Sequence, residues 1–216
     1  GKKITATTVL HYVNRHGSLT PDGYGSTNAA ANLYSELLQI PRDFSIVDFK
    51  DYKNDKYNTL DYYYTPYAFN PYFAINENQS KFFENRIYGS MQLDYKFFDW
   101  LSATWRIGTD VSSLSRNDWE AIMKFTPGTP NAVKSVTPNP GNVYEENRFT
   151  QEINSDLILS YTTSLGSDLK LDGIVGYNTY QRDYKALNGN ITSLVIPEFY
   201  NLGNTDGIPT TSTYVS

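Results

Sequence analysis

The protein has 216 residues, a formal net charge of −5, no Cys, and 19 Tyr beside 11 Phe. The lack of Cys excludes disulfides, thiol nucleophiles and Cys-based metal sites. The acidic balance argues against a nucleic-acid partner, and the many aromatic residues exclude a disordered chain. No apolar run is long enough for a transmembrane helix. A mean hydropathy of −0.51 is usual for a soluble protein, but membrane β-strands alternate apolar and polar residues and leave little trace in such a mean.

The first predicted strand lies near residues 4–14, where Ile4, Leu10 and Tyr12 share one face. The N-terminal residues 1–4 contain no apolar segment of the kind found in a signal peptide. The C-terminal residues follow a turn-rich stretch without a closing element. We therefore expect a fragment of a longer chain.

A short helix is predicted over Ala29–Gln39, within a long irregular segment near residues 15–84. Leu33 and Leu37 fall on one face of this helix. Pro41 ends it, because the residue before a proline is disfavoured in helical geometry.

Two hairpins follow, and both show period-2 alternation of apolar and polar residues. The first pairs strands near residues 85–98 and 100–112, and the second pairs strands near 148–162 and 168–183. The turn inside each hairpin is short, whereas the connections between the strand groups are long and rich in Asn, Pro, Gly, Thr and Tyr. The long connections lie near residues 15–84, 113–147 and 184–216.

Charged residues occur on only one face of the five predicted strands. The charged positions are Arg86, Asp94, Lys96, Arg106, Asp110, Glu152, Asp156, Lys170, Asp172 and Arg182. Such segregation indicates an all-β sheet with one face that avoids water, as in a soluble β-sandwich or a membrane β-barrel.

Strand length and turn asymmetry favour the barrel. The predicted strands run for about 12–15 residues, against about 5–6 in a typical strand and about 9–11 for one bilayer crossing. Short turns on one side and long loops on the other are characteristic of outer-membrane barrels. Five strands cannot close a barrel, and an open edge in lipid leaves backbone groups unpaired. A soluble carbohydrate-binding β-sandwich remains the alternative, and a passive porin is a second one.

Three segments resemble the SusC/RagA family of TonB-dependent outer-membrane transporters. They are Asp61–Phe73, Asn85–Asp110 and Leu194–Leu202. The resemblance implies a 22-stranded barrel in the bacterial outer membrane, filled by a plug domain that this chain lacks. It also implies a SusD-like surface lipoprotein as a lid, energy supplied through TonB, and import of oligosaccharides or peptides. No enzymatic activity and no cofactor is implied.

Two groups of site residues follow from this resemblance. Aromatic residues of the first long loop are candidates for contact with substrate or lid, because rings with polar tips suit sugars and interfaces. These are Tyr57, Tyr62, Tyr63, Tyr64, Tyr67, Phe69 and Tyr72. Packing of the loop against the barrel rim would explain the same rings. Charged residues of the polar face are candidates for contact with the plug, namely Arg86, Asp94, Lys96, Arg106, Asp110, Glu152 and Asp156.

Other chemistry finds no support in the sequence. The only histidines, His11 and His16, fall on opposite faces of the first predicted strand, so no metal site is expected. No nucleophile elbow, P-loop or dinucleotide fingerprint occurs. We expect no catalytic residue.

Overall fold

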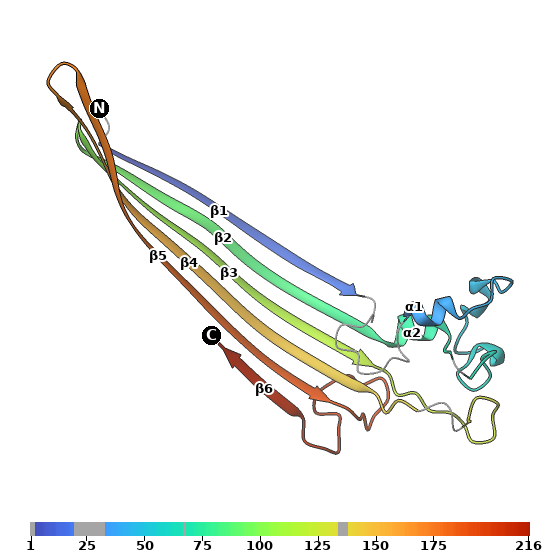
Figure 1. The fold of residues 1–216 in the computed structure, drawn as a ribbon. Helices are drawn as coiled ribbons and strands as arrows, with labels where there is room; N and C mark the ends of the chain where they lie inside the picture. The colour runs from blue at the N-terminus through green and yellow to red at the C-terminus, as the bar shows by residue number, and fades with distance from the viewer. Residues whose placement is uncertain (1–2, 20–32, 67, 134–137) are drawn as a thin grey trace.

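The computed structural model describes residues 3–19, 33–66, 68–133 and 138–216. Within these ranges, six strands form one antiparallel sheet and follow each other across it in chain order (Figure 1). The strands are β1 (Ile4–Leu19), β2 (Gln79–Phe98), β3 (Leu101–Glu120), β4 (Asn142–Leu165), β5 (Leu169–Ile191) and β6 (Thr210–Val215). The predicted all-β antiparallel fold is confirmed. The described residues form a single sheet, whereas a sandwich requires two.

Short turns lie at one end of the sheet and long connections at the other (Figure 1). Asp99 and Trp100 join β2 to β3, and residues 166–168 join β4 to β5. Gly166 adopts a φ of 76°, a left-handed conformation that glycine enters without steric cost. The short turns are therefore held by a few residues, and all larger loops gather at the opposite end.

The strands extend well beyond the predicted ranges toward the loop end. β2 begins at Gln79 instead of near residue 85, and β3 ends at Glu120 instead of near 112. These outer parts carry polar residues on both faces, so they show no alternation although their backbones stay paired. β6 (Thr210–Val215) lies in the stretch predicted to be a loop.

Helices occur only in the first long loop within the described residues. α1 spans Leu33–Leu38 and corresponds to the predicted helix, whose first four residues lie outside the described ranges. Two 3-10 turns follow, η2 (Ile46–Phe49) and η3 (Lys56–Asn58). A second helix, α2 (Pro71–Glu77), was not predicted. No helix in the described part of the chain is long and apolar enough to span a bilayer.

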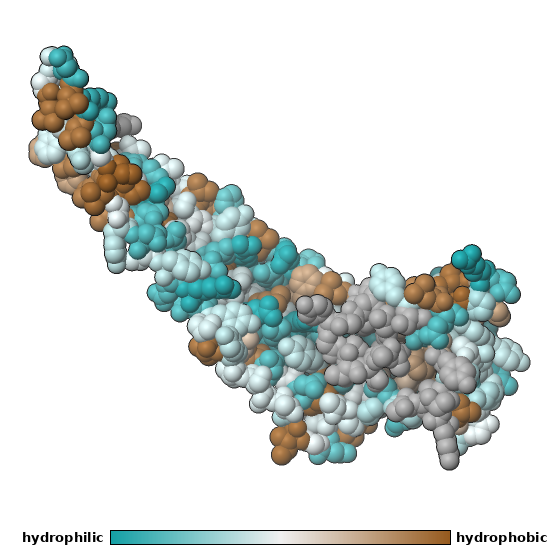
Figure 2. Space-filling model, in the orientation of Figure 1, coloured by the Kyte–Doolittle hydropathy of each residue, from teal (hydrophilic) through white to brown (hydrophobic). Residues whose placement is uncertain are grey.

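Buried side chains gather at the loop end, in two small clusters. One contains Phe49, Tyr63 and Ala68 of the first loop. The other contains Val143, Ile191 and Leu194, and Trp119 and Tyr200 pack against it. The sheet itself is one layer thick, so most strand side chains stay open on both faces. Figure 2 shows hydrophobic residues gathered at the narrow end formed by the β4–β5 hairpin.

Candidate functional site

An uncharged apolar band covers one face of the sheet near the short turns. Strand pairing places residues of the same face side by side in rows, such as Ala6, Leu93, Trp105, Leu157 and Tyr177. On β3 the band runs over 11 residues, from Leu101 to Val111. At about 3.3 Å per residue and a tilt of about 45°, this run covers roughly 24 Å of height.

The band crosses the sheet on a diagonal. One row joins Tyr12, Ile87 and Val111 with Gln151 and Asp183. The apolar residues of β1, β2 and β3 reach this row. On β4 they are continuous as far as Ile153, one row earlier, and Phe149 lies beyond the polar Gln151. On β5 they stop at Tyr177, six residues short of the row.

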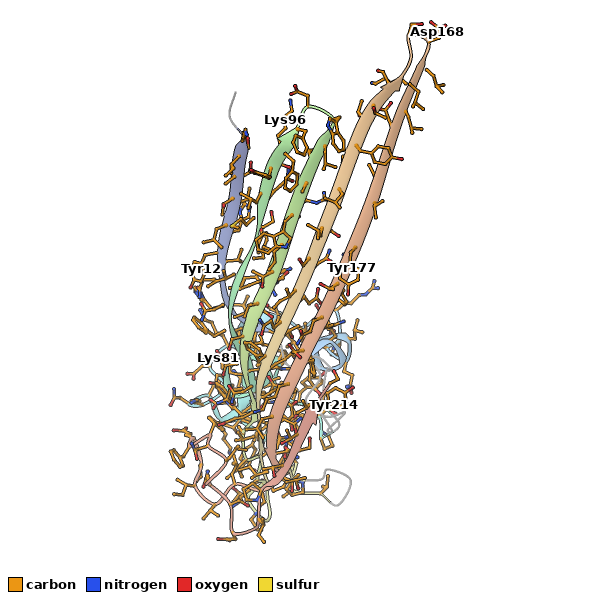
Figure 3. All side chains as sticks on the ribbon, turned by 90° about the vertical axis from the view of Figure 1, so that its left-hand side faces the viewer. Tyr12, Lys81, Lys96, Asp168, Tyr177 and Tyr214 are labelled. Atoms are coloured by element: carbon orange, nitrogen blue, oxygen red, sulfur yellow. The ribbon has the colours of Figure 1, made fainter. Side chains whose placement is uncertain are left out.

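This displacement gives the slope of the band. Six residues correspond to about 20 Å along the strand, while four strand spacings correspond to about 19 Å across the sheet. Averaged from β1 to β5, the band boundary therefore slopes at roughly 45° to the strands, close to the tilt of strands in a transmembrane barrel, and the displacement arises between β3 and β5. Figure 3 shows Tyr12 and Tyr177, the last residues of the band on β1 and β5, at nearly the same level.

Two polar groups of the band have hydrogen-bond partners, one inside the band and one just beyond its boundary. The indole Nε1 of Trp105 donates to Ser155 Oγ on the neighbouring strand at 3.0 Å. At the loop-side boundary, the Tyr12 hydroxyl donates to Asn85 Oδ1 at 2.6 Å, outside the apolar rows. Both hydrogen bonds suit an apolar environment, because leaving a donor unpaired there would cost free energy.

Aromatic rings mark the short-turn boundary. Phe98 and Trp100 stack with centroids 5.3 Å apart beside the β2–β3 turn. Tyr161 lies over Gly173, its partner on β5, and a Cβ at this glycine would be 2.4 Å from the ring. Amphipathic rings such as those of Trp100 and Tyr161 are typical of a membrane–water interface.

The opposite face carries the charged residues that the sequence placed there. Arg86 on β2 contacts Asp110 on β3, and Arg106 lies 3.4 Å from Asp156 on β4. Glu152 lies 3.4 Å from Arg182 on β5. These pairs link four strands in series.

The remaining two candidates of this face are also satisfied locally. Asp94 accepts hydrogen bonds from Thr104 Oγ1 at 2.7 Å and from Gln92 Nε2 at 2.8 Å. Lys96 lies 2.8 Å from Asp99 in the adjacent turn. All seven predicted plug-facing residues therefore have a partner on a strand or in the adjacent turn, and contact with a plug stays a prediction.

The structure separates the aromatic candidates of the first loop. Tyr63 and Phe69 are only 2% and 8% exposed, so they pack the loop core and are not available for contact. For these two residues the burial favours the packing role over contact with substrate or lid. Tyr72 is half-buried and packs against the same core. Tyr67 lies outside the described residues.

Three aromatic candidates reach the surface. Tyr57 is 70% exposed, and the Lys56 ammonium lies 5.9 Å from its ring centroid and 4.5 Å from that of Tyr62. Tyr64 is partly exposed, and its hydroxyl donates to the backbone oxygen of Gln39 at 2.9 Å. These rings remain candidates for a contact surface.

Buried amides, which the sequence analysis did not single out, hold the loops together. Asn131 Nδ2 donates to the backbone oxygens of Leu60 and Tyr63 at 2.8 and 3.0 Å. Asp61 Oδ1 accepts from the Thr126 backbone N–H at 2.7 Å. The second long loop is thereby docked on the first. Asn and Asp in a turn-rich stretch were the only signal for these contacts.

A groove of about 330 Å³ lies where the three long loops meet. Each loop supplies part of its lining, including Tyr52 and Phe73, Lys124, and Tyr200. At its edge, Glu77 accepts from the Tyr52 hydroxyl and from Lys53 Nζ, both at 2.7 Å.

The groove contains a tyrosine with a raised pKa and borders a residue with unusual backbone geometry. Burial, followed by the hydrogen bond to Glu77, raises the pKa of Tyr52 to about 12. The groove also borders Glu198, whose φ of 60° is unusual for a residue with a side chain. Across the described ranges, no cluster of His, Asp and Glu is arranged to hold a metal ion.

Comparisons with known proteins give a partial match. No family model matches the chain, and no curated protein matches it. Among solved structures, chains of the RagAB peptide importer match in its closed-closed and open-open states, with TM-scores of 0.46 and 0.45. Both matches have 15% identity and cover 68% of this chain. The chain spans 16% of the length of those chains.

Proposed function

We propose that this chain forms part of the wall of an outer-membrane β-barrel transporter. The observation that carries the proposal is the apolar band, which is free of charge, roughly 24 Å high and sloped like the strands of a tilted barrel. A soluble sheet would need a second layer to cover such a face, whereas lipid covers it directly.

Open strand edges support the need for further strands. In the described residues, the outer edge of β1 has no partner strand, and β6 pairs only with Lys185–Asn190 of β5. Unpaired backbone groups cost several kcal/mol each in lipid. Further strands of the same barrel would pair both edges, and a plug would face the charged side.

The transported substrate and the partners follow from the resemblance of Asp61–Phe73, Asn85–Asp110 and Leu194–Leu202 to the SusC/RagA family. We infer import of oligosaccharides or peptides, with a SusD-like lipoprotein as lid and with energy delivered by TonB. The loop layer and its exposed rings, such as Tyr57 and Tyr64, would lie on the side where lid and substrate arrive.

Lipid exposure can be tested with two adjacent positions on β5. Val175 lies in the apolar band and Ile174 on the opposite face, and both are well exposed. Each is replaced by Cys in the protein reconstituted in liposomes and labelled with a nitroxide. We expect the label at 175, but not that at 174, to collide with lipid-dissolved oxygen and to be shielded from a water-soluble relaxer. Equal access of the water-soluble relaxer to both labels would contradict the proposal.

Transport needs a separate test in cells. A strain without the gene should lose growth on one class of oligosaccharide or peptide as nutrient, and complementation should restore it. Uptake should also stop when a protonophore removes the energy that TonB uses. Uptake that continues under the protonophore would indicate a passive porin.

A further inference from the structure

Glu36 is a buried carboxylate at the contact between α1 and the chain that leads into α2. Its side chain is 2% exposed, and Oε2 accepts a hydrogen bond from the backbone N–H of Phe69. Phe69 is itself buried, and Asn70 after it caps α2. The carboxylate therefore joins α1 to residues 68–70.

The surroundings of Glu36 offer little to stabilise a negative charge. Among the described residues, Glu36 forms no ion pair with a Lys, Arg or His. The titratable groups whose electrostatics couple to it are the phenols of Tyr63 and Tyr64. The Tyr63 hydroxyl is buried and has no hydrogen-bond partner in the described structure. A phenol pocket without a cation disfavours the ionised carboxylate.

The charged groups of the neighbouring elements point elsewhere. Glu77 of α2 is engaged by Tyr52 and Lys53 at the three-loop groove. Asp48 of η2 is exposed to solvent. Both residues are themselves acidic and cannot act as a counter-charge for Glu36, and Lys53 is paired with Glu77.

Burial accordingly raises the pKa of Glu36 to about 7, and the Phe69 N–H opposes this only in part. A carboxyl whose pKa rises on docking is most favourable to the docked state while it is protonated. The contribution is complete below the ordinary pKa of 4.5 and is lost as the pH rises to about 7.

We propose that Glu36 makes the docking of α1 sensitive to pH, so that α1 is held against residues 68–70 in acid and is released above neutrality. Release would break the contact between α1 and the buried Phe69. This pH-dependent docking of α1 depends on the packing of the first loop alone and does not require the transport function.

Hydrogen exchange of the intact protein in detergent tests this device. Amide exchange of residues 33–40 is followed at pH 5.5 and 8.5 and corrected for the intrinsic pH dependence of exchange. If opening exposes Glu36 fully, the open fraction should rise roughly 30-fold between these values. An unchanged open fraction in the wild-type protein would overturn the proposal without any variant.

Two variants identify the group responsible. In Glu36→Gln the corrected exchange of residues 33–40 should no longer depend on pH, because Gln does not titrate. Asp43→Asn, an exposed acidic residue of the same loop, should keep the wild-type pH dependence. Exchange of the β2 and β3 amides serves as the check that each variant is folded. Retained pH dependence in a folded Glu36→Gln variant would assign the effect to another group.

Discussion

Asn70 connects several parts of the first loop through its side chain. It is completely buried, and its Nδ2 donates to the backbone oxygens of Phe49 and Asn58 at 2.8 and 3.0 Å. Its Oδ1 accepts from the backbone N–H of Tyr72 at 2.9 Å and so caps α2. The Asn70 side chain thus links η2, η3 and the start of α2.

We predict that Asn70→Ala loosens this loop without affecting the sheet. Two buried carbonyls and one N–H would lose their partner, at a cost of about 2–4 kcal/mol. Hydrogen exchange of residues 49–58 and 71–77 should quicken, while that of β2 stays unchanged. Asn54→Ala, which changes an exposed amide in the same loop, is the matched control. Equal effects of the two substitutions would contradict the role assigned to Asn70.

Individual residues were the hardest feature to predict from the sequence. The ring-rich stretch around Tyr63 was recognised as a candidate surface, but Tyr63 and Phe69 face inward while Tyr57 faces solvent. Composition cannot separate these roles, because an irregular loop has no period that assigns side chains to an inside and an outside. Asn70 followed by Pro71 is itself a sequence signal for the start of α2, because Asn caps helices and Pro favours the first helical position.

At the scale of the strand, neighbouring residues meet opposite environments. Leu157 and Ile158 are adjacent on β4, but Leu157 lies in the apolar band and Ile158 on the charged face. In a soluble sheet that exposes both faces, neither position would resist a charge strongly. In a bilayer only Leu157 would resist a charge strongly.

We predict that Leu157→Arg destabilises the folded protein in liposomes by about 2–4 kcal/mol, whereas Ile158→Arg costs much less. The reason is that only the first substitution places a guanidinium against lipid. Urea unfolding in liposomes, followed by the loss of the folded band on a semi-native gel, measures the difference. Similar losses for both variants would argue against lipid on the Leu157 face.

The ion pairs of the charged face are expected to add little to stability. Arg106 and Asp156 are both partly exposed at 3.4 Å, and Asp156 also accepts from Asn178 Nδ2 at 2.7 Å. We predict that Arg106→Gln changes the free energy of unfolding by less than about 1 kcal/mol. The same urea titration reports this change. A loss of several kcal/mol would mean that the pair is shielded from water by a covering domain.

Strand faces were predictable from the sequence, and strand ends were not. Within the band, alternation assigned each side chain to its face, and the observed pairing of Ala6, Leu93, Trp105 and Leu157 agrees. Beyond the band both faces meet polar surroundings, so the contrast vanishes although backbone pairing continues. The Thr-rich β6 (Thr210–Val215) lacked this contrast entirely.

The whole molecule is asymmetric along the strand direction. Short turns, stacked rings and the apolar band lie at one end, while the three long loops lie at the other, where Asp61 and Asn131 join the first loop to the second. In a barrel wall, this asymmetry assigns the loop end to the outside of the cell, because outer-membrane barrels keep their short turns in the periplasm.

We therefore predict that the two ends differ in access from outside the cell. The chain has no Cys, so Asp206→Cys in the third loop and Ser167→Cys in the β4–β5 turn provide single reporters in it. Both positions are exposed. A membrane-impermeant maleimide should label position 206 on intact cells, and position 167 only after the outer membrane is permeabilised. Because both thiols should react equally in the detergent-purified protein, a difference on cells reports the membrane barrier and not local burial. Labelling of 167 but not 206 on intact cells would reverse the orientation, and labelling of both would exclude a position across the outer membrane.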